Sequence, residues 1–318
     1  MDPDDLPPPQ LRLRRDAVAR GWSDDELAAL TRAGSLTRLR RGAYVDGPLP
    51  EAAVVRHRLL VHATLAALRR PAVVSHQSAA VLLGLPLWGV HLREVHITRP
   101  PPAASESSRT LRCHVAPLAA GDSDEVDGVR VTSPARTVLD LARTVGFTSA
   151  VVAADAALRP RGSSADGLTS GAALAHQLDR VRGAPGSRRA ERVVSFADGR
   201  SESVGESRSR VVLTDLGLAP TMLQYEIRSG SRVLARTDFA WEDVRLVGEF
   251  DGRVKYGRLL RPGQEPGDAV FEEKLREDAI RDTGHGVVRW CWNDLAQPTT
   301  LAVRVRRARE RARRQASA

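Results

Sequence analysis

The chain has 318 residues, 42% of them hydrophobic, and its 48 Lys and Arg exceed its 39 Asp and Glu to give a net charge of +9. This length is enough for two or three cores, since domains usually hold about 100 to 150 residues. A basic excess of this size favours polyanionic partners such as nucleic acid. Cys113 and Cys291 are far apart in sequence, which excludes the paired spacing of a zinc or dithiol motif.

The N-terminal ten residues are acidic and proline-rich, whereas a secretory signal is basic and then apolar. No uninterrupted apolar run approaches the roughly 20 residues of a membrane span, so we expect a cytoplasmic protein that does not bind membranes. A stretch rich in Gly, Ser and Arg at 159–189 indicates a domain boundary. We therefore predict four regions: a DNA-binding region at 1–48, a mixed domain at 49–158, a linker with helical segments at 159–199, and a C-terminal domain at 200–318.

The first region has the pattern of two helices and a hairpin. A helix is predicted over Leu11–Arg20, and Ser23 with Glu26 forms the capping box of a second helix that ends at Gly34. The segment Leu36–Arg40 alternates apolar and polar residues before an Arg41-Gly42 turn and a return strand. This order predicts a winged helix.

Basic side chains surround the predicted wing. A winged helix uses such residues to neutralise phosphates while a helix enters the major groove. A solvated basic surface in an arginine-rich chain would look the same, and composition does not separate the two interpretations. The residues expected to contact DNA are Arg32, Arg38, Arg40, Arg41 and Tyr44.

The region 49–158 mixes helices and strands. A long helix is predicted at Ala52–Arg69, and shorter elements follow at Val73-Val74, Gln77–Leu83, Glu94–Arg99, Leu111–Ala116 and Pro134–Arg143. His76 reads as a polar helix start and not as a catalytic base, because no nucleophile elbow accompanies it. Arg136 and Asp140 are one helical turn apart and are expected to form a surface or interdomain ion pair.

The N-terminal half resembles the AbiEi family. The resemblance rests on Gly21-Trp22-Ser23, 34–45, 75–80, 84–87 and 132–142. AbiEi proteins are antitoxins of type IV toxin–antitoxin systems that repress their own operons. The resemblance implies sequence-specific DNA binding, and a cognate toxin as a possible partner.

The C-terminal part reads as helix, three strands, helix, strand, helix, an αβββαβα order that indicates a small α/β core. Its predicted strands contain carboxylates, which are costly to bury unless they are paired or bind a cation. With a two-residue turn at Glu242-Asp243, Asp238 lies opposite Val247, on one face with Glu249 and Asp251. A three-residue turn would place Asp238 on the other face.

Oxygen ligands of this kind suit Mg²⁺, which takes one or two carboxylates from a protein and keeps several waters. Asp238, Glu249 and Asp251 are the predicted metal ligands, Lys255 would orient the water or neutralise the phosphate, and Glu206 would add a ligand or hydrogen bond. The alternative is that these carboxylates pair with arginines such as Arg236, Arg245, Arg253 and Arg276 in an inactive fold.

The same segment resembles the PD-(D/E)xK nuclease superfamily, in the branch of very-short-patch-repair endonucleases. The supporting residues are Glu206, Asp238-Phe239, 247–252, 276–278 and 287–290. One departure is that Asp251 stands where lysine is common in that superfamily. The overall expectation is a multidomain α+β protein that binds DNA and carries a Mg²⁺-dependent endonuclease-like domain, working or degenerate. The alternative is a non-catalytic antitoxin-like autorepressor.

Overall fold

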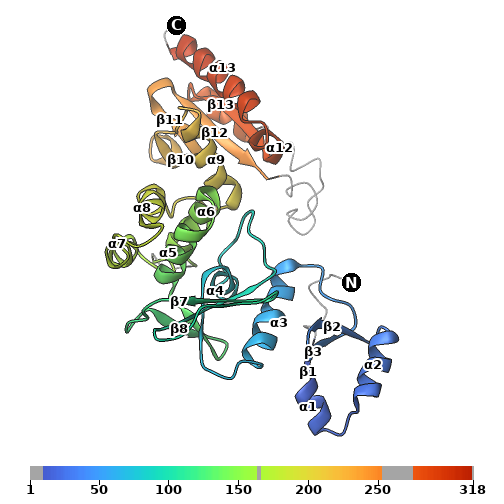
Figure 1. Ribbon diagram of the computed structural model, residues 1–318. Coiled ribbons are helices and arrows are strands. Elements are labelled where there is room, and N and C mark those ends of the chain that lie inside the picture. Colours follow the sequence, from blue (N-terminus) through green and yellow to red (C-terminus); the bar gives the residue numbers. More distant parts are fainter. Residues whose placement is uncertain (1–9, 163–165, 253–274, 317–318) are drawn as a thin grey trace. The chain divides into compact units, whose positions relative to one another are not determined.

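The computed structural model describes residues 10–162, 166–252 and 275–316 (Figure 1). The protein is a mixed α and β chain with three separate sheets in the described ranges. It divides into two compact units, Met1–Ser149 with Gly171–Glu191, and Ala150–Ser170 with Arg192–Ala318. In the described part of the chain, no helix has both the length and the apolar character needed to cross a membrane.

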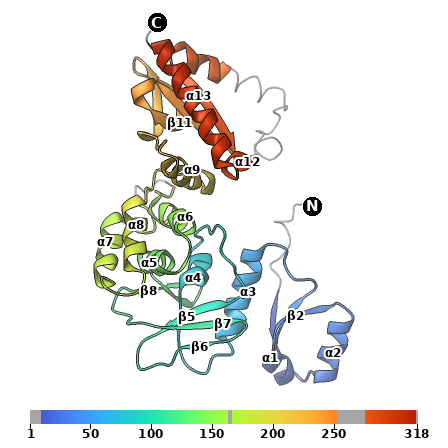
Figure 2. The same cartoon turned by 45° about the horizontal axis from the view of Figure 1, so that its top comes forward.

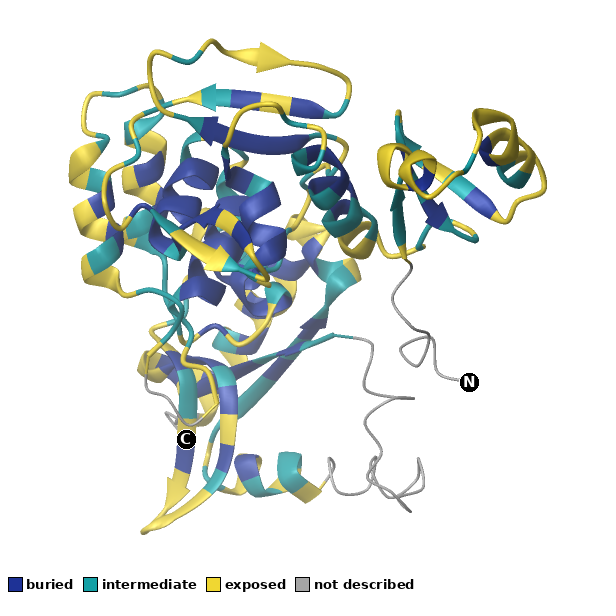
Figure 3. Ribbon diagram, turned by 90° about the horizontal axis from the view of Figure 1, so that it is seen from below, coloured by how far each residue is buried: buried dark blue, intermediate teal, exposed yellow. Residues whose placement is uncertain are grey.

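The N-terminal region is a small sheet with two helices. Its elements are β1 (Leu11–Leu13), α1 (Arg14–Ala19), α2 (Asp24–Arg32), β2 (Leu36–Arg40) and β3 (Ala43–Asp46). The sheet has the order β1-β3-β2, with β3 antiparallel to both neighbours. Most of its residues are exposed or intermediate in Figure 3, as expected for so small a core.

The structure corrects one boundary in this region. Leu11–Leu13, predicted as the start of a helix, forms a strand that pairs with Val45, Tyr44 and Ala43. The helix begins only at Arg14. Periodicity alone does not report a strand whose partner lies about 30 residues away in the chain, so the apolar spacing was assigned to the wrong element.

The start of α2 follows the predicted capping box. The Ser23 hydroxyl accepts a hydrogen bond from the Glu26 amide at 3.1 Å, and the Glu26 carboxylate accepts one from the Ser23 amide at 2.7 Å. Trp22 packs on the cluster that contains Leu27, as expected for a hydrophobic staple. Local sequence therefore fixes where this helix begins.

The second sheet has six strands in the order β6-β7-β5-β4-β9-β8. The strands are β4 (Val73–Val74), β5 (Val95–Arg99), β6 (Glu106–Ser107), β7 (Leu111–Val115), β8 (Ser123–Val126) and β9 (Val129–Thr132). Helices α3 (Ala53–Leu65) and α4 (His76–Leu82) both contact β5 (Figure 2). Helix α5 (Pro134–Thr144) follows β9 and contacts α4. Ile97, Val95 and Val131 are fully buried in the core beside this sheet.

Three helices follow α5 in the chain. They are α6 (Phe147–Leu158), α7 (Gly171–Arg180) and α8 (Ser187–Phe196). The last two occupy much of the stretch predicted as a linker with helical segments. Asp155 on α6 is buried and accepts hydrogen bonds from Arg210 at 2.7 Å and from the Asp198 amide at 2.8 Å.

The third sheet has the order β10-β11-β12-β13, with β12 and β13 parallel. Its strands are β10 (Met222–Ser229), β11 (Arg232–Trp241), β12 (Leu246–Asp251) and β13 (Gly286–Cys291). Helices α9 (Val204–Asp215), α12 (Trp292–Leu295) and α13 (Pro298–Ala316) accompany it, with a further helix at 275–282. Trp241, Trp290 and Phe239 form the core on one side of this sheet, together with residues of α9 and α13. The predicted order of elements is reproduced, and the predicted helix at Ala269–Asp282 is described only from 275 onward.

Candidate functional site

Several arginines of the N-terminal region pair with carboxylates of the same region, while others have no such partner among the described residues. Arg12 pairs with Asp46 and Arg14 pairs with Asp24. Arg32, Arg38 and Arg41 are exposed and form no ion pair with any described residue. Arg32 ends α2, while the other two lie on the β2–β3 hairpin. These three cations are available to an external anion.

The other two residues expected to contact DNA are engaged within the fold. The Arg40 guanidinium donates a hydrogen bond to the Ala63 carbonyl at 3.2 Å, and partial burial lowers its pKa. Tyr44 packs against the cluster formed by Ala17, Leu27 and Leu36. Both side chains therefore have a structural role in this region.

The predicted carboxylates lie on adjacent strands, but in a different register. Trp241 pairs with Leu246, and the four residues between them form a short 3₁₀ helix at Glu242–Val244 and a left-handed Arg245 with φ of 50°. Side chains alternate between the two faces of a sheet, so lengthening the turn from two to four residues leaves the face of each side chain unchanged. Asp238 therefore lies on the predicted face, together with Glu249 and Asp251. Continuing the Phe239–Gly248 pairing places Asp238 across from Glu249. The predicted position opposite Val247 was wrong by two residues.

The carboxylates of this face have different surroundings. Asp238 accepts a hydrogen bond from the Phe250 amide at 2.8 Å. One carboxylate oxygen of Asp251 is buried and has no hydrogen-bond partner among the described residues. A buried acceptor without a partner is uncommon and calls for a ligand, a water or a proton.

Glu249 is held by two arginines. Arg276 donates to one of its oxygens, and Arg289, its neighbour on β13, donates to the other at 2.9 Å. Arg289 also reaches Glu277 at 2.5 Å. This arrangement matches the alternative interpretation from the sequence, in which arginines neutralise the cluster, and Arg276 was one of the residues named there.

Glu206 lies in the first turn of α9. Its carboxylate accepts hydrogen bonds from the Glu202 amide at 2.8 Å, the Ser203 hydroxyl at 2.8 Å and the Gln224 side chain at 2.9 Å. Burial, the largest influence, raises its pKa. Gly205, the residue before it, lies so close to Phe250 that an added Cβ would overlap the ring. The absence of a side chain at 205 lets the start of α9 approach β12.

In the part of the chain that the structure describes, two of the predicted Mg²⁺ ligands are engaged with other groups of the protein. Both oxygens of Glu249 already accept from guanidinium groups, and an oxygen of Asp238 accepts a backbone amide. Among the described residues, the carboxylates at 206, 238, 249 and 251 do not form a group of three close enough to share an ion. Lys255 lies outside the described residues, as does Arg253.

A buried charge network surrounds Asp122. Its carboxylate accepts hydrogen bonds from Arg180, from Gln177 at 2.8 Å and from Arg136 at 3.2 Å. Burial raises its pKa, but the hydrogen bonds from Arg180, Gln177 and the Ala119 amide outweigh burial and lower the pKa to about 2. Arg136 also donates to Asp140 at 3.0 Å, and both side chains are almost fully buried. The expected ion pair forms, but it is buried inside one compact unit, so the expectation of a surface or interdomain position was wrong.

Three histidines, which the sequence did not single out as a group, meet beside the six-stranded sheet. They are His76 at the start of α4, His96 on β5 and His114 on β7. Nδ1 of His96 lies 3.0 Å from Nε2 of His114, and the rings of His76 and His114 stack with centroids 3.7 Å apart. Burial, the largest influence, lowers the pKa of His96 to about 3 and that of His114 to about 4, and it also lowers the pKa of His76. All three imidazoles are therefore neutral at physiological pH.

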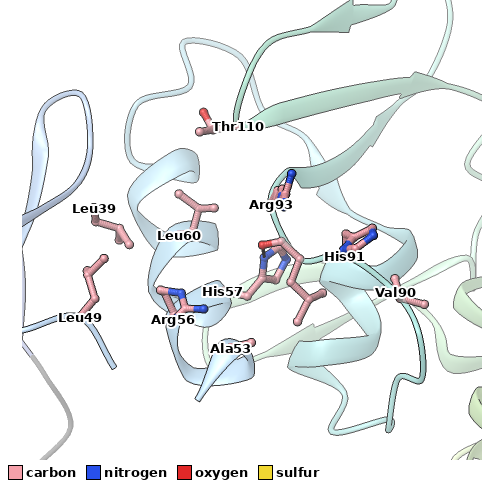
Figure 4. A pocket seen from close by; sticks show the side chains of 11 residues that line it. Leu39, Leu49, Ala53, Arg56, His57, Leu60, Val90, His91, Arg93 and Thr110 are labelled. Carbon is pink, nitrogen blue, oxygen red and sulfur yellow. Dashed lines mark hydrogen bonds between the residues drawn. The ribbon is translucent and has the colours of Figure 1, made fainter. Parts of the chain in front are cut away.

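A pocket of about 440 Å³ lies beside α3 (Figure 4). Leu39, Leu49 and Leu60 supply apolar surface, while Arg56 and Arg93 supply positive charge. His57, also in its lining, is held by the Leu92 carbonyl at 3.0 Å and by Ser78 at 2.9 Å. None of the described residues that line the pocket is acidic, so it lacks an evident acid–base pair.

Comparisons with known proteins give relatives without an assigned function. No family model matches the chain. The uncharacterized proteins Rv2248 and MT2308, from two strains of Mycobacterium tuberculosis, are 33% identical over 189 residues, which is 59% of this chain. The match spans 65% of each relative's own length. The crystal structure of the RV2827C protein from Mycobacterium tuberculosis is similar at 17% identity, with a TM-score of 0.39, over 73% of this chain and 85% of that one.

Proposed function

We propose that this protein is a DNA-binding regulator of the antitoxin-like repressor class, with its N-terminal region acting as a winged helix. The observation that carries the proposal is the set of three exposed arginines, Arg32, Arg38 and Arg41, on one helix end and one hairpin. Neighbouring arginines pair with carboxylates, whereas these have no partner among the described residues. Unpaired guanidinium groups bind phosphates without first breaking an internal ion pair.

Salt dependence of binding tests the proposal. The full chain is titrated into a labelled duplex from upstream of its own gene, and anisotropy is followed at several salt concentrations. Replacing Arg32, Arg38 and Arg41 together by alanine should weaken binding. It should also reduce the slope of log K against log salt by about 1 for each of these arginines that binds a phosphate in the wild type.

Arg14→Ala is the matched control, because Arg14 is also exposed in this region but pairs with Asp24. It should leave the salt slope close to that of the wild type. Binding that is unchanged in the triple variant, or reduced equally by Arg14→Ala, would reject the assignment of these arginines to DNA.

Metal-dependent phosphodiester hydrolysis by the C-terminal domain is the second candidate function. Its support is the shared face of Asp238, Glu249 and Asp251 and the unpartnered oxygen of Asp251 among the described residues. The pairing of Glu249 with Arg276 and Arg289 argues against hydrolysis, and we therefore place the DNA-binding regulator first. Plasmid DNA incubated with the protein and Mg²⁺ or Mn²⁺ should remain intact if the domain is non-catalytic. Cleavage that Asp238→Ala abolishes would make hydrolysis the primary function.

A further inference from the structure

The cluster of His76, His96 and His114 combines three nitrogen donors from three separate elements. One ligand atom from each residue lies within 4.8 Å of the other two. Tetrahedral coordination with bonds of about 2.0–2.1 Å places nitrogen ligands about 3.3 Å apart. The 3.0 Å between His96 and His114 is already close to this value. The remaining adjustment is a rotation of the His76 ring, which now stacks on His114.

The neighbours of the cluster hold the outer nitrogens. Ser75 Oγ lies 2.9 Å from Nδ1 of His76, and the side-chain nitrogen of Gln77 lies 2.7 Å from Nε2 of His96. A flip of the Gln77 amide exchanges its nitrogen and oxygen at nearly the same positions. With the oxygen facing the ring, His96 carries its proton on Nε2 and presents a lone pair on Nδ1. Partners of this kind orient the histidine ligands of metal sites.

Two further observations point to a ligand. His76 has a φ of 53°, a left-handed conformation that a residue with a Cβ adopts only at a cost, and its ring stacks on His114 within the cluster. Thr98 lies on the same face of β5 as His96, pairs in register with His114, and is almost fully buried. Its hydroxyl has no hydrogen-bond partner among the described residues. A metal-bound water would give that hydroxyl a partner.

We propose that His76, His96 and His114 form a site for a divalent transition-metal ion, Zn²⁺ by preference, with a water as fourth ligand. Three imidazoles suit Zn²⁺ and its first-row neighbours, while Mg²⁺ prefers oxygen ligands. The ion links the start of α4 to β5 and β7. The partial exposure of His114 supplies a route of entry. This site is independent of the proposed DNA contacts and of the carboxylates in the C-terminal domain.

Metal content and the Co²⁺ spectrum test the proposal on the full chain. After dialysis against a chelator, the protein is loaded with Zn²⁺ and desalted, and zinc is counted by mass spectrometry; about one ion per chain is expected. Co²⁺ in its place should give the intense visible bands of a four-coordinate site. Substoichiometric zinc together with a weak six-coordinate Co²⁺ spectrum in the wild type would overturn the proposal without any variant.

Variants locate the ion. His114→Gln and His96→Ala should lose zinc and the Co²⁺ bands, and Ser75→Ala should weaken binding by about 10- to 100-fold because His76 loses an outer partner. His91→Ala, an exposed histidine outside the cluster, is the control and should bind as the wild type does. Chelation should lower the melting temperature of the wild type but not that of His114→Gln. Zinc retained by both cluster variants at wild-type affinity would place the ion elsewhere.

Discussion

The N-terminal region and the network around Asp122 use arginine for different purposes. Around Asp122, Arg136 and Arg180 donate to carboxylates inside the fold, and Arg136 is 5% exposed. On the hairpin, Arg38 and Arg41 are exposed and have no carboxylate partner among the described residues. Arginine content alone therefore does not identify a DNA-binding surface. The absence of an internal carboxylate partner reduces the number of arginines that are candidates for contacting DNA.

Arg136→Ala should produce the largest loss of stability. The substitution leaves Asp140 and Asp122 with fewer donors in a buried setting, and breaking a buried ion pair from one side costs about 3–5 kcal/mol. The free energy of unfolding in denaturant measures the loss. Arg182→Ala, which breaks the exposed pair with Asp179, is the control and should change stability by less than about 1 kcal/mol. Equal losses of stability in the two variants would contradict the distinction between buried and exposed arginines.

Acidification should produce the second-largest loss of stability, by protonating Asp122. The pKa of Asp122 is about 2 in the fold and about 3.9 in an unfolded chain, so its carboxylate contributes about 2–3 kcal/mol at pH values above about 5. A group with a lowered pKa loses this contribution as pH falls from about 5 through the folded pKa of about 2. The stability difference between wild type and Asp122→Asn should therefore narrow over that window. Asp140, whose pKa is raised by burial, is present in both proteins. A stability difference between the two proteins that stays constant with pH would contradict the lowered pKa of Asp122.

Ser23→Ala tests the N-terminal region without touching an arginine. Removal of the capping hydroxyl should destabilise α2 by about 1 kcal/mol. Hydrogen exchange of the α2 amides should then be about fivefold faster, since about 1.4 kcal/mol corresponds to a factor of ten. Ser35→Ala, at an exposed position whose side chain makes no hydrogen bond with a described residue, should leave the exchange rates unchanged.

Arg38→Ala with Arg41→Ala should have the smallest effect on folding. Exposed side chains without partners usually change stability by no more than about 0.5 kcal/mol. The melting temperature should stay within experimental error of the wild type while DNA affinity falls. A large drop in the melting temperature would show that these arginines act inside the fold, like Arg136.

Local features of the fold were predictable, and long-range ones were not. The capping box at Ser23 and the hairpin around Gly42 depend on neighbouring residues, and both follow the prediction. The strand at Leu11–Leu13 depends on a partner far along the chain, so helical spacing misassigned it. The order of helices and strands along the chain was enough to predict the mixed α and β class.

The same distinction applies to the candidate sites. Alternation along β11 and β12 put Asp238 and Glu249 on one face, but the loop geometry at Arg245 set the register. Pairing of Glu249 with Arg289 required the parallel alignment of β12 with β13. The three histidines meet because β5 and β7 pair in parallel, and nothing in the spacing of positions 76, 96 and 114 indicated it. The one available sign was a histidine in each of two neighbouring strands.

The close approach of Gly205 to Phe250 has a consequence for the history of this domain. Any side chain at 205 would collide with the ring, whatever the neighbouring Glu206 does. Packing against Phe250 therefore requires glycine at 205, independently of any role of Glu206. In homologous domains with another residue at 206, glycine should still stand at the preceding position wherever an aromatic ring occupies the place of Phe250.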